Sequence, residues 1–337
     1  MRYCGIDLHS NNSVVVIIDE TDRVLFDRRL PNELSGIVAT LEAHRAELFG
    51  VVVESTYNWY WLVDGLEAAG FPVTLANTVA IKQYEGLKHG DDTTDARHLA
   101  HLLRLGILPR AYIYPKRERA VRDLARKRMQ LVRSRTQHIL AVQNIVARER
   151  AQTMSALVVE QLDRAAIEAL GLAPEVALAL SSNVAVIQTL CEQIEAVEKR
   201  LSSCVRSRPE YALLTSVPGI GAILAMVILL ETGSIERFAS AGDFASYARC
   251  VKSQRLSNGR KKGSGNAKNG NPYLAWAFIE AAHFARRYCS EARRFHDRKR
   301  ARTNPVVASK ALAHKIARAC YHMLSSGVPF DVKRCFG

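Results

Sequence analysis

The first thirty residues limit the fold of this chain more than any other feature. Residues 3–8 and 13–18 are short apolar runs rich in β-branched side chains, and only the polar segment 9–12 separates them. Two such runs joined by a few polar residues predict a β-hairpin. Residues 23–29 add a third candidate strand next to this hairpin.

The next fifty residues alternate between helical and strand-like patterns. We expect a helix over residues 31–49, a buried strand at 51–54, a helix at 62–69 and a further strand at 73–76. Strands that alternate with helices indicate an α/β domain whose sheet is covered on both faces. A hairpin followed by parallel strands favours an RNase H-like sheet. No Gly-x-Gly-x-x-Gly follows the first strand, which argues against a nucleotide cofactor.

The charge of the chain is unusual. Among its 337 residues, 47 are Lys or Arg and 33 are Asp or Glu, which leaves a net charge of +14. Such a surplus favours a polyanionic partner, namely DNA, RNA or an anionic membrane surface, although a solvated basic face gives the same count. The composition is otherwise ordinary, with 48% hydrophobic and 24% charged residues, and argues against disorder.

Cysteine spacing and hydropathy indicate where the protein works. The seven cysteines are scattered and include no Cys-x-x-Cys pair, so we expect reduced thiols in a cytoplasm. We expect no signal sequence, because Asp7 and His9 interrupt the first apolar run, and no stretch approaches roughly 18 uninterrupted apolar residues. We therefore expect no membrane span.

The chain changes character near residue 116, and we divide it into domains at 1–115, 116–205 and 206–337. Residues 116–150 hold eleven basic and three acidic residues without Gly or Pro, which predicts one long helix. A coiled-coil seam follows, with apolar residues at spacings of three and four: Ile187, Leu190, Ile194, Val197 and Leu201. Its partner is either the basic helix, in an antiparallel hairpin, or another copy of the chain.

The last third of the chain, which we expect to be mainly α-helical, begins with a glycine-rich turn. Residues 217–221 (Val-Pro-Gly-Ile-Gly) precede an apolar helix and resemble a helix-hairpin-helix, in which backbone N–H groups of Gly219 and Gly221 would approach a phosphate. A tight turn before a buried helix is the alternative. Residues 249–271 then carry seven basic residues, no acidic ones and four glycines.

Four carboxylates occupy positions that suit a metal site. Asp7 and Glu54 end two strands, while Asp92 and Asp95 lie one turn apart at the start of a predicted helix over 93–105. Converging carboxylates repel unless a cation neutralises them, and hard oxygen ligands select Mg²⁺ or Mn²⁺. Singly, each acid has an ordinary alternative role as a helix cap, a turn residue or a partner of Arg. The nearby His9, His89 and His98 lack a zinc spacing and count as peripheral.

Motifs in both halves of the chain resemble a known family. They are Gly-Ile-Asp-Leu-His-Ser at 5–10, Glu54, Asp-Thr-Thr-Asp-Ala-Arg at 92–97, residues 217–221, Glu-Thr-Gly at 231–233 with Phe238, Phe-Ala-Ser-Tyr at 244–247, Ser257, and Lys-Asn-Gly-Asn at 268–271 before Leu274. In this order they resemble the DEDD transposases of the insertion-sequence-110 family, whose N-terminal domain is similar to the RuvC resolvase.

The resemblance implies a chemistry that spacing alone does not give. Asp7, Glu54, Asp92 and Asp95 would be the metal ligands, and Ser257 would attack a DNA phosphate to form a covalent 5′-phosphoserine-type link. It further implies donor and target DNA, a structured guide RNA, and a homo-oligomer between a dimer and a tetramer in which one subunit's acidic site meets another's serine.

Two departures from the family pattern leave the nucleophile open. Asn258 follows Ser257 where the family has Gly, and Asn266-Ala267-Lys268 stands where Ile-Ser-Lys is common, so Ser253 is a second candidate. Positive charge for the phosphate would come from residues near the serine: Arg255, Arg260, Lys261, Lys262 and Lys268.

Two other functions remain open from the sequence. A RuvC-like junction-resolving nuclease would use water in place of the serine, and a non-catalytic nucleic-acid-binding module would use the carboxylates for structure alone. Neither gives the region around Ser257 a chemical task. The sequence therefore favours a transposase or recombinase that cuts and rejoins DNA.

Overall fold

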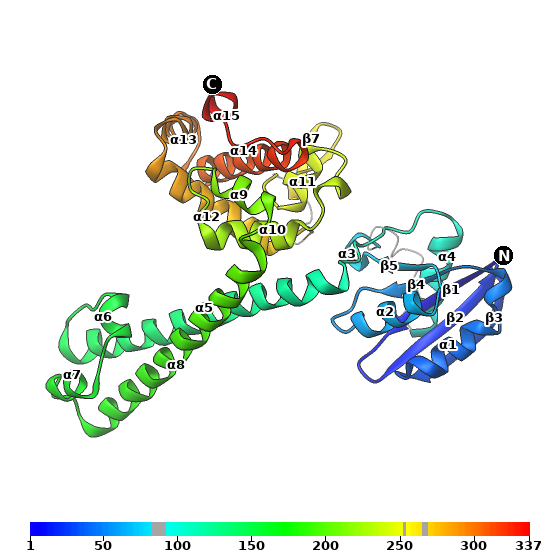
Figure 1. The fold of residues 1–337 in the computed structure, drawn as a ribbon, viewed down its shortest axis with the longest axis horizontal. Coiled ribbons are helices and arrows are strands. Elements are labelled where there is room, and N and C mark those ends of the chain that lie inside the picture. The colour runs from blue at the N-terminus through cyan, green and yellow to red at the C-terminus, as the bar shows by residue number, and fades with distance from the viewer. Residues whose placement is uncertain (82–91, 252–253, 265–268) are drawn as a thin grey trace. The chain divides into compact units, whose positions relative to one another are not determined.

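The chain folds into two compact units, which are described separately. A computed structural model describes residues 1–81, 92–251, 254–264 and 269–337, with the backbone but not the side chains of residues 254–257, 261 and 264. The first unit is Met1–Lys116 and the second is Arg117–Gly337 (Figure 1). The boundary at residue 205 stays a prediction.

The first unit is built on a five-stranded mixed sheet. Its strands are β1 (Arg2–Leu8), β2 (Asn12–Asp19), β3 (Val24–Pro31), β4 (Leu48–Glu54) and β5 (Val73–Ala76). They lie in the order β3-β2-β1-β4-β5, with β2 antiparallel to β1 and β3, and with β1, β4 and β5 parallel. The hairpin, the third strand and the later parallel strands predicted from the sequence are confirmed.

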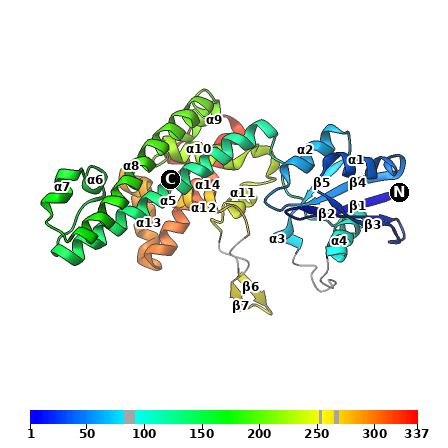
Figure 2. The ribbon, with the colours of Figure 1, turned by 90° about the horizontal axis from the view of Figure 1, so that it is seen from below.

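Helices cover both faces of this sheet (Figure 2). On one face α1 (Leu34–Glu42) and α2 (Tyr60–Ala68) bury Ile37 and Leu62 against the strands, and on the other lies α4 (Asp92–Arg104). The short elements are α3 (Thr78–Ile81) and a 3-10 turn (Arg45–Glu47). Buried side chains lie on both sides of β1 and β2, which explains their continuous apolar runs.

The predicted helix over 31–49 was too long at both ends. Pro31 pairs with Asn12 as the last residue of β3, and Leu48 pairs with Arg2 as the first residue of β4. Only Leu34–Glu42 is α-helical. The apolar spacing of this segment is compatible with a helix, but tertiary pairing with β1 and β2 overrides it at the ends.

Helix α4 rests directly on the backbone of β1. A Cβ atom at Gly5 would lie 1.9 Å from the carbonyl oxygen of Ala96 and 2.8 Å from the amide nitrogen of Ala100. Ala96, Leu99 and Ala100 are buried in the contact. Only glycine permits this approach, which fixes where the first turn of α4 lies above the sheet.

The second unit begins with two long helices. Helix α5 (Lys116–Arg150) forms as predicted, and α8 (Pro174–Val205) runs antiparallel to it, with α6 (Ala156–Glu160) and α7 (Arg164–Ala169) between them (Figure 1). The direction follows from two contacts, Arg128 to Glu198 at 2.7 Å and His138 to Asn183 at 2.8 Å. The seam of α8 therefore has α5 of the same chain as a partner, while a coiled-coil geometry stays a prediction.

Among the described residues, α8 is the one helix long and apolar enough to cross a bilayer by length and composition. The N-terminal half of α8, however, packs on α5 through Leu180, Val184 and Ile187, which share a buried cluster with Ile139 and Val142. Length and composition of a single helix are weak evidence for a membrane span.

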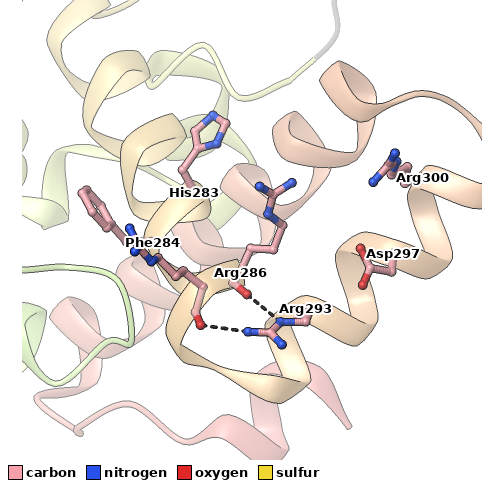
Figure 3. A pocket seen from close by; sticks show the side chains of 7 residues that line it. His283, Phe284, Arg286, Arg293, Asp297 and Arg300 are labelled. Atoms are coloured by element: carbon pink, nitrogen blue, oxygen red, sulfur yellow. Dashed lines mark hydrogen bonds between the residues drawn. The ribbon is translucent and has the colours of Figure 1, made fainter. Parts of the chain in front are cut away.

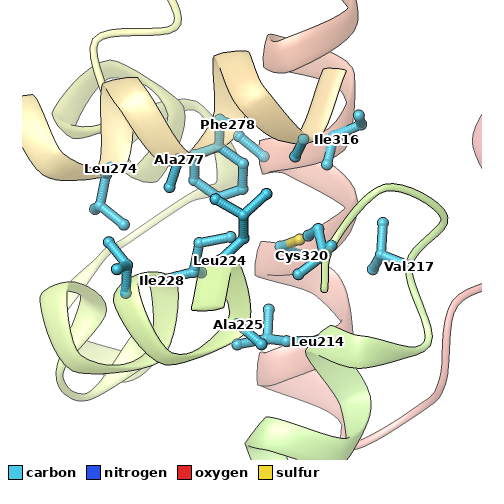
Figure 4. Close-up of a cluster of buried hydrophobic side chains, with 14 of the residues drawn as sticks. Leu214, Val217, Leu224, Ala225, Ile228, Leu274, Ala277, Phe278, Ile316 and Cys320 are labelled. Carbon is cyan, nitrogen blue, oxygen red and sulfur yellow. The ribbon is translucent and has the colours of Figure 1, made fainter. Parts of the chain in front are cut away.

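The rest of the second unit is a helical body with one small hairpin, in agreement with the predicted helical C-terminal part. Its elements are α9 (Pro209–Thr215), α10 (Ala222–Thr232), a 3-10 turn (Ile235–Arg237), α11 (Ala241–Tyr247), β6 (Gln254–Ser257), β7 (Arg260–Ser264), α12 (Pro272–Tyr288), α13 (Ser290–Arg302), α14 (Pro305–Ser326) and α15 (Val332–Phe336). Leu224 and Ile228 of α10 pack on Phe278 of α12 and Ile316 of α14 (Figure 4).

The glycine-rich turn before α10 packs against protein. A Cβ atom at Gly219 would lie 2.4 Å from the amide nitrogen of Ala285 in α12, and the φ of Gly219 is +94°. Gly221, which precedes α10, has open space beside it. This packing is that of a tight turn before a buried helix, and phosphate binding by the two glycines stays a prediction.

The contact between β1 and α4 gives the first prediction. Gly5→Ala should lower the free energy of unfolding by about 3 kcal/mol or more, because backbone atoms of α4 must move to accept the methyl group. The matched control is Gly36→Ala in α1, where no atom lies within 4 Å of the new Cβ. It should leave stability unchanged or raise it by up to about 1 kcal/mol.

Both variants would be measured in the full chain by urea unfolding, followed through tryptophan fluorescence. Trp59 and Trp61 report on the first unit. Equal stability of the Gly5 and Gly36 variants would contradict this account of the contact.

Candidate active site

Two of the candidate carboxylates lie on neighbouring strands at the same level of the sheet. Ile6 of β1 pairs with Val53 of β4, so Asp7 and Glu54 are the next residues on two parallel strands. Side chains alternate along a strand, and Ile6 and Val53 face α1 and α2. Asp7 and Glu54 therefore face the side of α4. The side chain of Asp7 is buried, with the residue 4% exposed.

The first turn of α4 brings a third carboxylate to Asp7. One oxygen of Asp7 and one of Asp92 each lie 3.3 Å from Nε2 of His9. One ligand atom from each of Asp7, His9 and Asp92 lies within 4.8 Å of the others, the one such group found in the part of the chain that the structure describes. Glu54 and Asp95 are outside this group, one on the adjacent strand and the other one helical turn further along α4.

His9 is the functional candidate that sequence reasoning missed. It was set aside as peripheral because it has no zinc spacing, yet it lies between the two carboxylates. Its backbone is held firmly: its carbonyl oxygen accepts hydrogen bonds from the side-chain amides of Asn32 at 3.0 Å and Asn58 at 2.9 Å. The usable signal was its place two residues after Asp7, in the turn that leaves β1.

An arginine closes the exposed side of this cluster. One guanidinium nitrogen of Arg29 in β3 lies 2.6 Å from a carboxylate oxygen of Asp92, and another donates to Oδ1 of Asn12 at 3.1 Å. The side chain of Arg29 is 56% exposed. A positive charge therefore already neutralises Asp92 at the mouth of the site.

These residues fit a divalent cation. Carboxylate oxygens are the ligands that Mg²⁺ and Mn²⁺ prefer, and the buried Asp7 carboxylate beside another carboxylate calls for positive charge. Imidazole is a common ligand of first-row transition metals, so His9 adds a nitrogen donor that Mg²⁺ rarely uses. The identity of the metal is not fixed by this donor set.

The candidate nucleophile lies at a tight hairpin turn in the second unit. Ser257 is the last residue of β6 and pairs with Arg260 of β7. Asn258 and Gly259 between them have φ values of +50° and +70°, the conformation of a type I′ turn. Asn-Gly is the preferred pair for that turn, which accounts for Asn directly after the serine in this chain.

The predicted phosphate-binding residues are placed only in part. Arg260 and Lys262 are exposed on β7. For Arg255 and Lys261, as for Ser257, the structure describes the backbone and not the side chain. Ser253 and Lys268 lie outside the described residues. The preference for Ser257 over Ser253 as the nucleophile therefore rests on the sequence motif alone.

A buried ion pair holds the base of this hairpin. The carboxylate of Glu231 in α10 is 2% exposed and accepts two hydrogen bonds from the Arg126 guanidinium of α5, at 2.6 and 2.8 Å. It also accepts one from the side-chain amide of Asn271 at 2.7 Å. Burial lowers the pKa of Arg126, but the hydrogen bonds and charge of Glu231 outweigh burial and raise that pKa above its usual value.

Asn271 joins the two ends of the segment that carries the serine. Its amide nitrogen donates to the carbonyl oxygen of Tyr247 at 2.6 Å, and its side-chain oxygen accepts from the backbone of Tyr273 and Leu274 to cap α12. Gly270 packs against Tyr247 so closely that a Cβ would lie 2.4 Å from the Tyr247 carbonyl oxygen. Residues from three of the sequence motifs thus meet at one buried place.

The thiols of Cys250 and Cys335 in the second unit both have raised pKa values. Burial raises the pKa of the Cys250 thiol to about 12, and burial raises that of Cys335 to about 11. A thiol attacks as its thiolate, so these two are inert at neutral pH. All seven cysteines are free of disulfides, in agreement with the sequence.

Both candidate sites lie in regions that are similar to transposase families. Residues 4–148 match the DEDD transposase family of IS110 elements, and residues 211–297 match the family described as "Transposase IS116/IS110/IS902 family". The first range includes Asp7, Glu54, Asp92 and Asp95, and the second includes Ser257.

Individual relatives agree with these matches. Over 336 residues the chain is 23% identical to the transposase for insertion sequence element IS1111A of Coxiella burnetii, covering 98% of this chain and 88% of that protein. It is 28% identical over 141 residues to an insertion element IS110 protein of Streptomyces coelicolor, and the match covers 42% of this chain and 35% of that protein. It is 27% identical over 146 residues to the IS1328 transposase of Yersinia enterocolitica, and the match covers 42% of this chain and 44% of that protein.

The ion pair below the hairpin gives the second prediction. Glu231→Gln should lower the free energy of unfolding by about 3 kcal/mol, since it removes the buried carboxylate and leaves the partly buried Arg126 guanidinium without its counter-charge. The control is Glu198→Gln, because the Glu198 side chain that pairs with Arg128 is 34% exposed, whereas that of Glu231 is 2% exposed. That change should cost at most about 1 kcal/mol.

Urea unfolding of the full-length variants measures both losses. If the Glu231 and Glu198 variants lose the same stability, the Arg126–Glu231 pair is not what holds α5, α10 and α12 together.

Proposed function

The chain belongs to the insertion-sequence-110 family of transposases, and from this premise we propose that it cuts and rejoins DNA with a divalent-metal site and a serine nucleophile. Asp7, Glu54, Asp92 and Asp95 would hold the metal, with Mg²⁺ or Mn²⁺ as the expected ion. Ser257 would attack the DNA. The observation that carries this proposal is the convergence of Asp7 and Asp92 on one point at the end of β1.

We propose an RNase H-like, and more narrowly RuvC-like, fold for the first unit. The strand order β3-β2-β1-β4-β5, with a three-stranded antiparallel half and a parallel half, supports it. In such a sheet, side chains at the carboxyl ends of β1 and β4 are neighbours, and a helix that crosses the sheet can add further acids. Glu54 and Asp95 are within one strand and one helical turn of the Asp7–His9–Asp92 group, which makes them suitable additional ligands.

The proposed chemistry is an exchange of phosphodiester bonds. The oxygen of Ser257 attacks the phosphorus, an Oγ–P bond forms, and the bond from phosphorus to the 3′ oxygen breaks, which leaves a 3′ hydroxyl and a 5′-phosphoserine. Rejoining is the reverse, with a 3′ hydroxyl of another strand as the attacking group and serine as the leaving group. When bound, a divalent cation supplies positive charge to the phosphate and lowers the pKa of an attacking hydroxyl.

The residues around the serine suit this task. Arg260 and Lys262 are exposed on β7, directly after the turn, and can neutralise a phosphate that approaches Ser257. His9 orients the Asp7 and Asp92 carboxylates toward each other. Arg29 can exchange its contact with Asp92 for a contact with a DNA phosphate once a cation takes over the neutralisation of Asp92.

Two partners complete the proposal. A structured guide RNA would choose donor and target DNA by base pairing, and a dimer or tetramer would bring the acidic site of one subunit to the serine of another. The basic residues of the second unit, above all on α5 and between residues 249 and 302, provide the charge that both nucleic acids need.

The third prediction concerns the serine. Incubated with its donor and target DNA, guide RNA and Mg²⁺, the chain should form a protein–DNA adduct that survives denaturation. Ser257→Ala should abolish the adduct, whereas Ser253→Ala should retain it, because only one hydroxyl forms the bond. Denaturing electrophoresis of labelled DNA measures the adduct.

The alternative functions give different results in the same assay. Cleavage without any adduct would indicate a junction-resolving nuclease, and tight binding without cleavage would indicate a non-catalytic binding module. Loss of the adduct in the Ser253 variant alone would move the nucleophile to that residue.

The fourth prediction concerns the metal ligands. Asp7→Asn should abolish strand cleavage and weaken Mn²⁺ binding at least tenfold, because it removes a ligand charge but keeps the size of the side chain. Glu67→Gln removes an exposed carboxylate from α2 of the same unit and should change neither quantity. Calorimetric titration with Mn²⁺ and the cleavage assay measure the two effects, and unchanged Mn²⁺ affinity in the Asp7 variant would exclude that residue from the site.

A further inference from the structure

An arginine-rich pocket lies between α12 and α13 in the second unit, on elements that carry neither the acidic cluster nor the serine (Figure 3). It has a volume of about 590 Å³ and is lined by His283, Phe284, Arg286, Arg287, Arg293, Asp297 and Arg300. Four guanidinium groups and one carboxylate give it a formal charge of +3. None of these residues takes part in the proposed bond-breaking and bond-forming steps.

One of the arginines builds the pocket and the others are available to a ligand. Arg293 donates to the backbone carbonyl oxygens of Arg286 at 3.1 Å and Arg287 at 2.9 Å, and so ties α13 to the end of α12. Among described residues, none places a carboxylate within ion-pair distance of Arg286, Arg287 or Arg300. Arg286 and Arg300 line the pocket (Figure 3), and Arg287 is a further lining residue.

Two exposed aromatic rings lie beside these charges. Phe284 lines the pocket, and Tyr288 follows one turn later on α12; they are 41% and 69% exposed. Their rings are almost parallel, with an interplanar angle of 9° and centroids 6.4 Å apart. The guanidinium of Arg287 lies 5.7 Å from the Tyr288 ring centre. Large aromatic faces left in water next to arginines suit a flat, apolar group that carries negative charge.

We propose that this pocket, with Phe284 and Tyr288, binds an unpaired stretch of nucleic acid. A base stacks on the two rings while Arg286, Arg287 and Arg300 contact the phosphates on either side of it. Stacking requires a free base face, which a single strand offers and a duplex hides. The inference rests on the proposed function only in taking nucleic acid as the partner, and it assigns the handling of unpaired strands to this surface.

The test uses the full-length chain without divalent metal, so that no cleavage occurs. Fluorescence anisotropy would measure its affinity for labelled twelve-nucleotide strands, oligo-uridine and oligo-thymidine, and for a twelve-base-pair duplex. The double variant Phe284→Ala/Tyr288→Ala should bind the single strands at least tenfold more weakly and the duplex unchanged. Both rings are exposed, so the fold is preserved. Phe49→Ala, which removes a 51% exposed ring from β4 of the first unit, should bind as the unaltered chain does.

Charge variants separate stacking from phosphate contact. Arg286→Gln/Arg300→Gln should reduce the slope of log affinity against log salt by about one to two, whereas the aromatic variant should leave that slope unchanged. Asp297→Asn removes the one carboxylate of the pocket and should tighten binding.

Each outcome decides the proposal. Tighter binding of oligo-uridine assigns the site to RNA, tighter binding of oligo-thymidine assigns it to a displaced DNA strand, and equal binding assigns it to either strand. Unchanged single-strand affinity in the aromatic variant, or an equal loss for the duplex, would overturn it. A chain that binds single strands through Phe284 but forms no serine adduct would contradict the proposed function and leave this site intact.

Discussion

The close approach of the α4 backbone to Gly5 of β1 positions the candidate site of the first unit. Because Gly5 has no side chain, the backbone of α4 lies against β1, and the first turn of α4 is set above the carboxyl end of that strand. Asp92 then reaches the same point as Asp7, with His9 between them. A methyl group at residue 5 would clash with the carbonyl group of Ala96 and force α4 away from β1. The packing of α4 on β1 thus brings the residues of the candidate site together. Arg29 contributes only a positive charge beside Asp92.

The elements that could be predicted from the sequence are those whose pattern has one physical explanation. β1 and β2 are apolar on both faces because α1 and α2 cover one side and α4 the other, and α5 has neither Gly nor Pro over 35 residues. The ends of α1 could not be predicted, since Pro31 and Leu48 are taken by strand pairing. His9 was missed for a similar reason: its role depends on Asn32 and Asn58, which hold its backbone from distant segments.

In the second unit, the ion pair between Arg126 and the buried Glu231 positions helices, as the contact at Gly5 does in the first unit. Arg126 and Glu231 cost desolvation energy that a pair of apolar side chains would not, so the pair serves the position of α5, α10 and α12 rather than stability as such. Asn271 connects the pair to Tyr247 and to the cap of α12. The hairpin with Ser257 starts from this rigid base, while its turn is shaped locally by Asn258 and Gly259. The segment that carries Ser257 is thereby joined to this hydrogen-bonded group through Tyr247 and Asn271.

The two units differ in charge, and this difference bears on how they meet DNA. Residues 1–116 carry 11 Lys and Arg against 15 Asp and Glu, a net charge of −4, whereas residues 117–337 carry 36 against 18, a net charge of +18. The whole basic surplus therefore belongs to the unit with Ser257 and the α12–α13 pocket, and that unit must supply most of the attraction for phosphates. The acidic unit repels a phosphate backbone, and a cation held by Asp7 and Asp92, as proposed above, would reduce that repulsion. Metal and DNA would then bind the first unit cooperatively, because each would remove part of the electrostatic cost of binding the other.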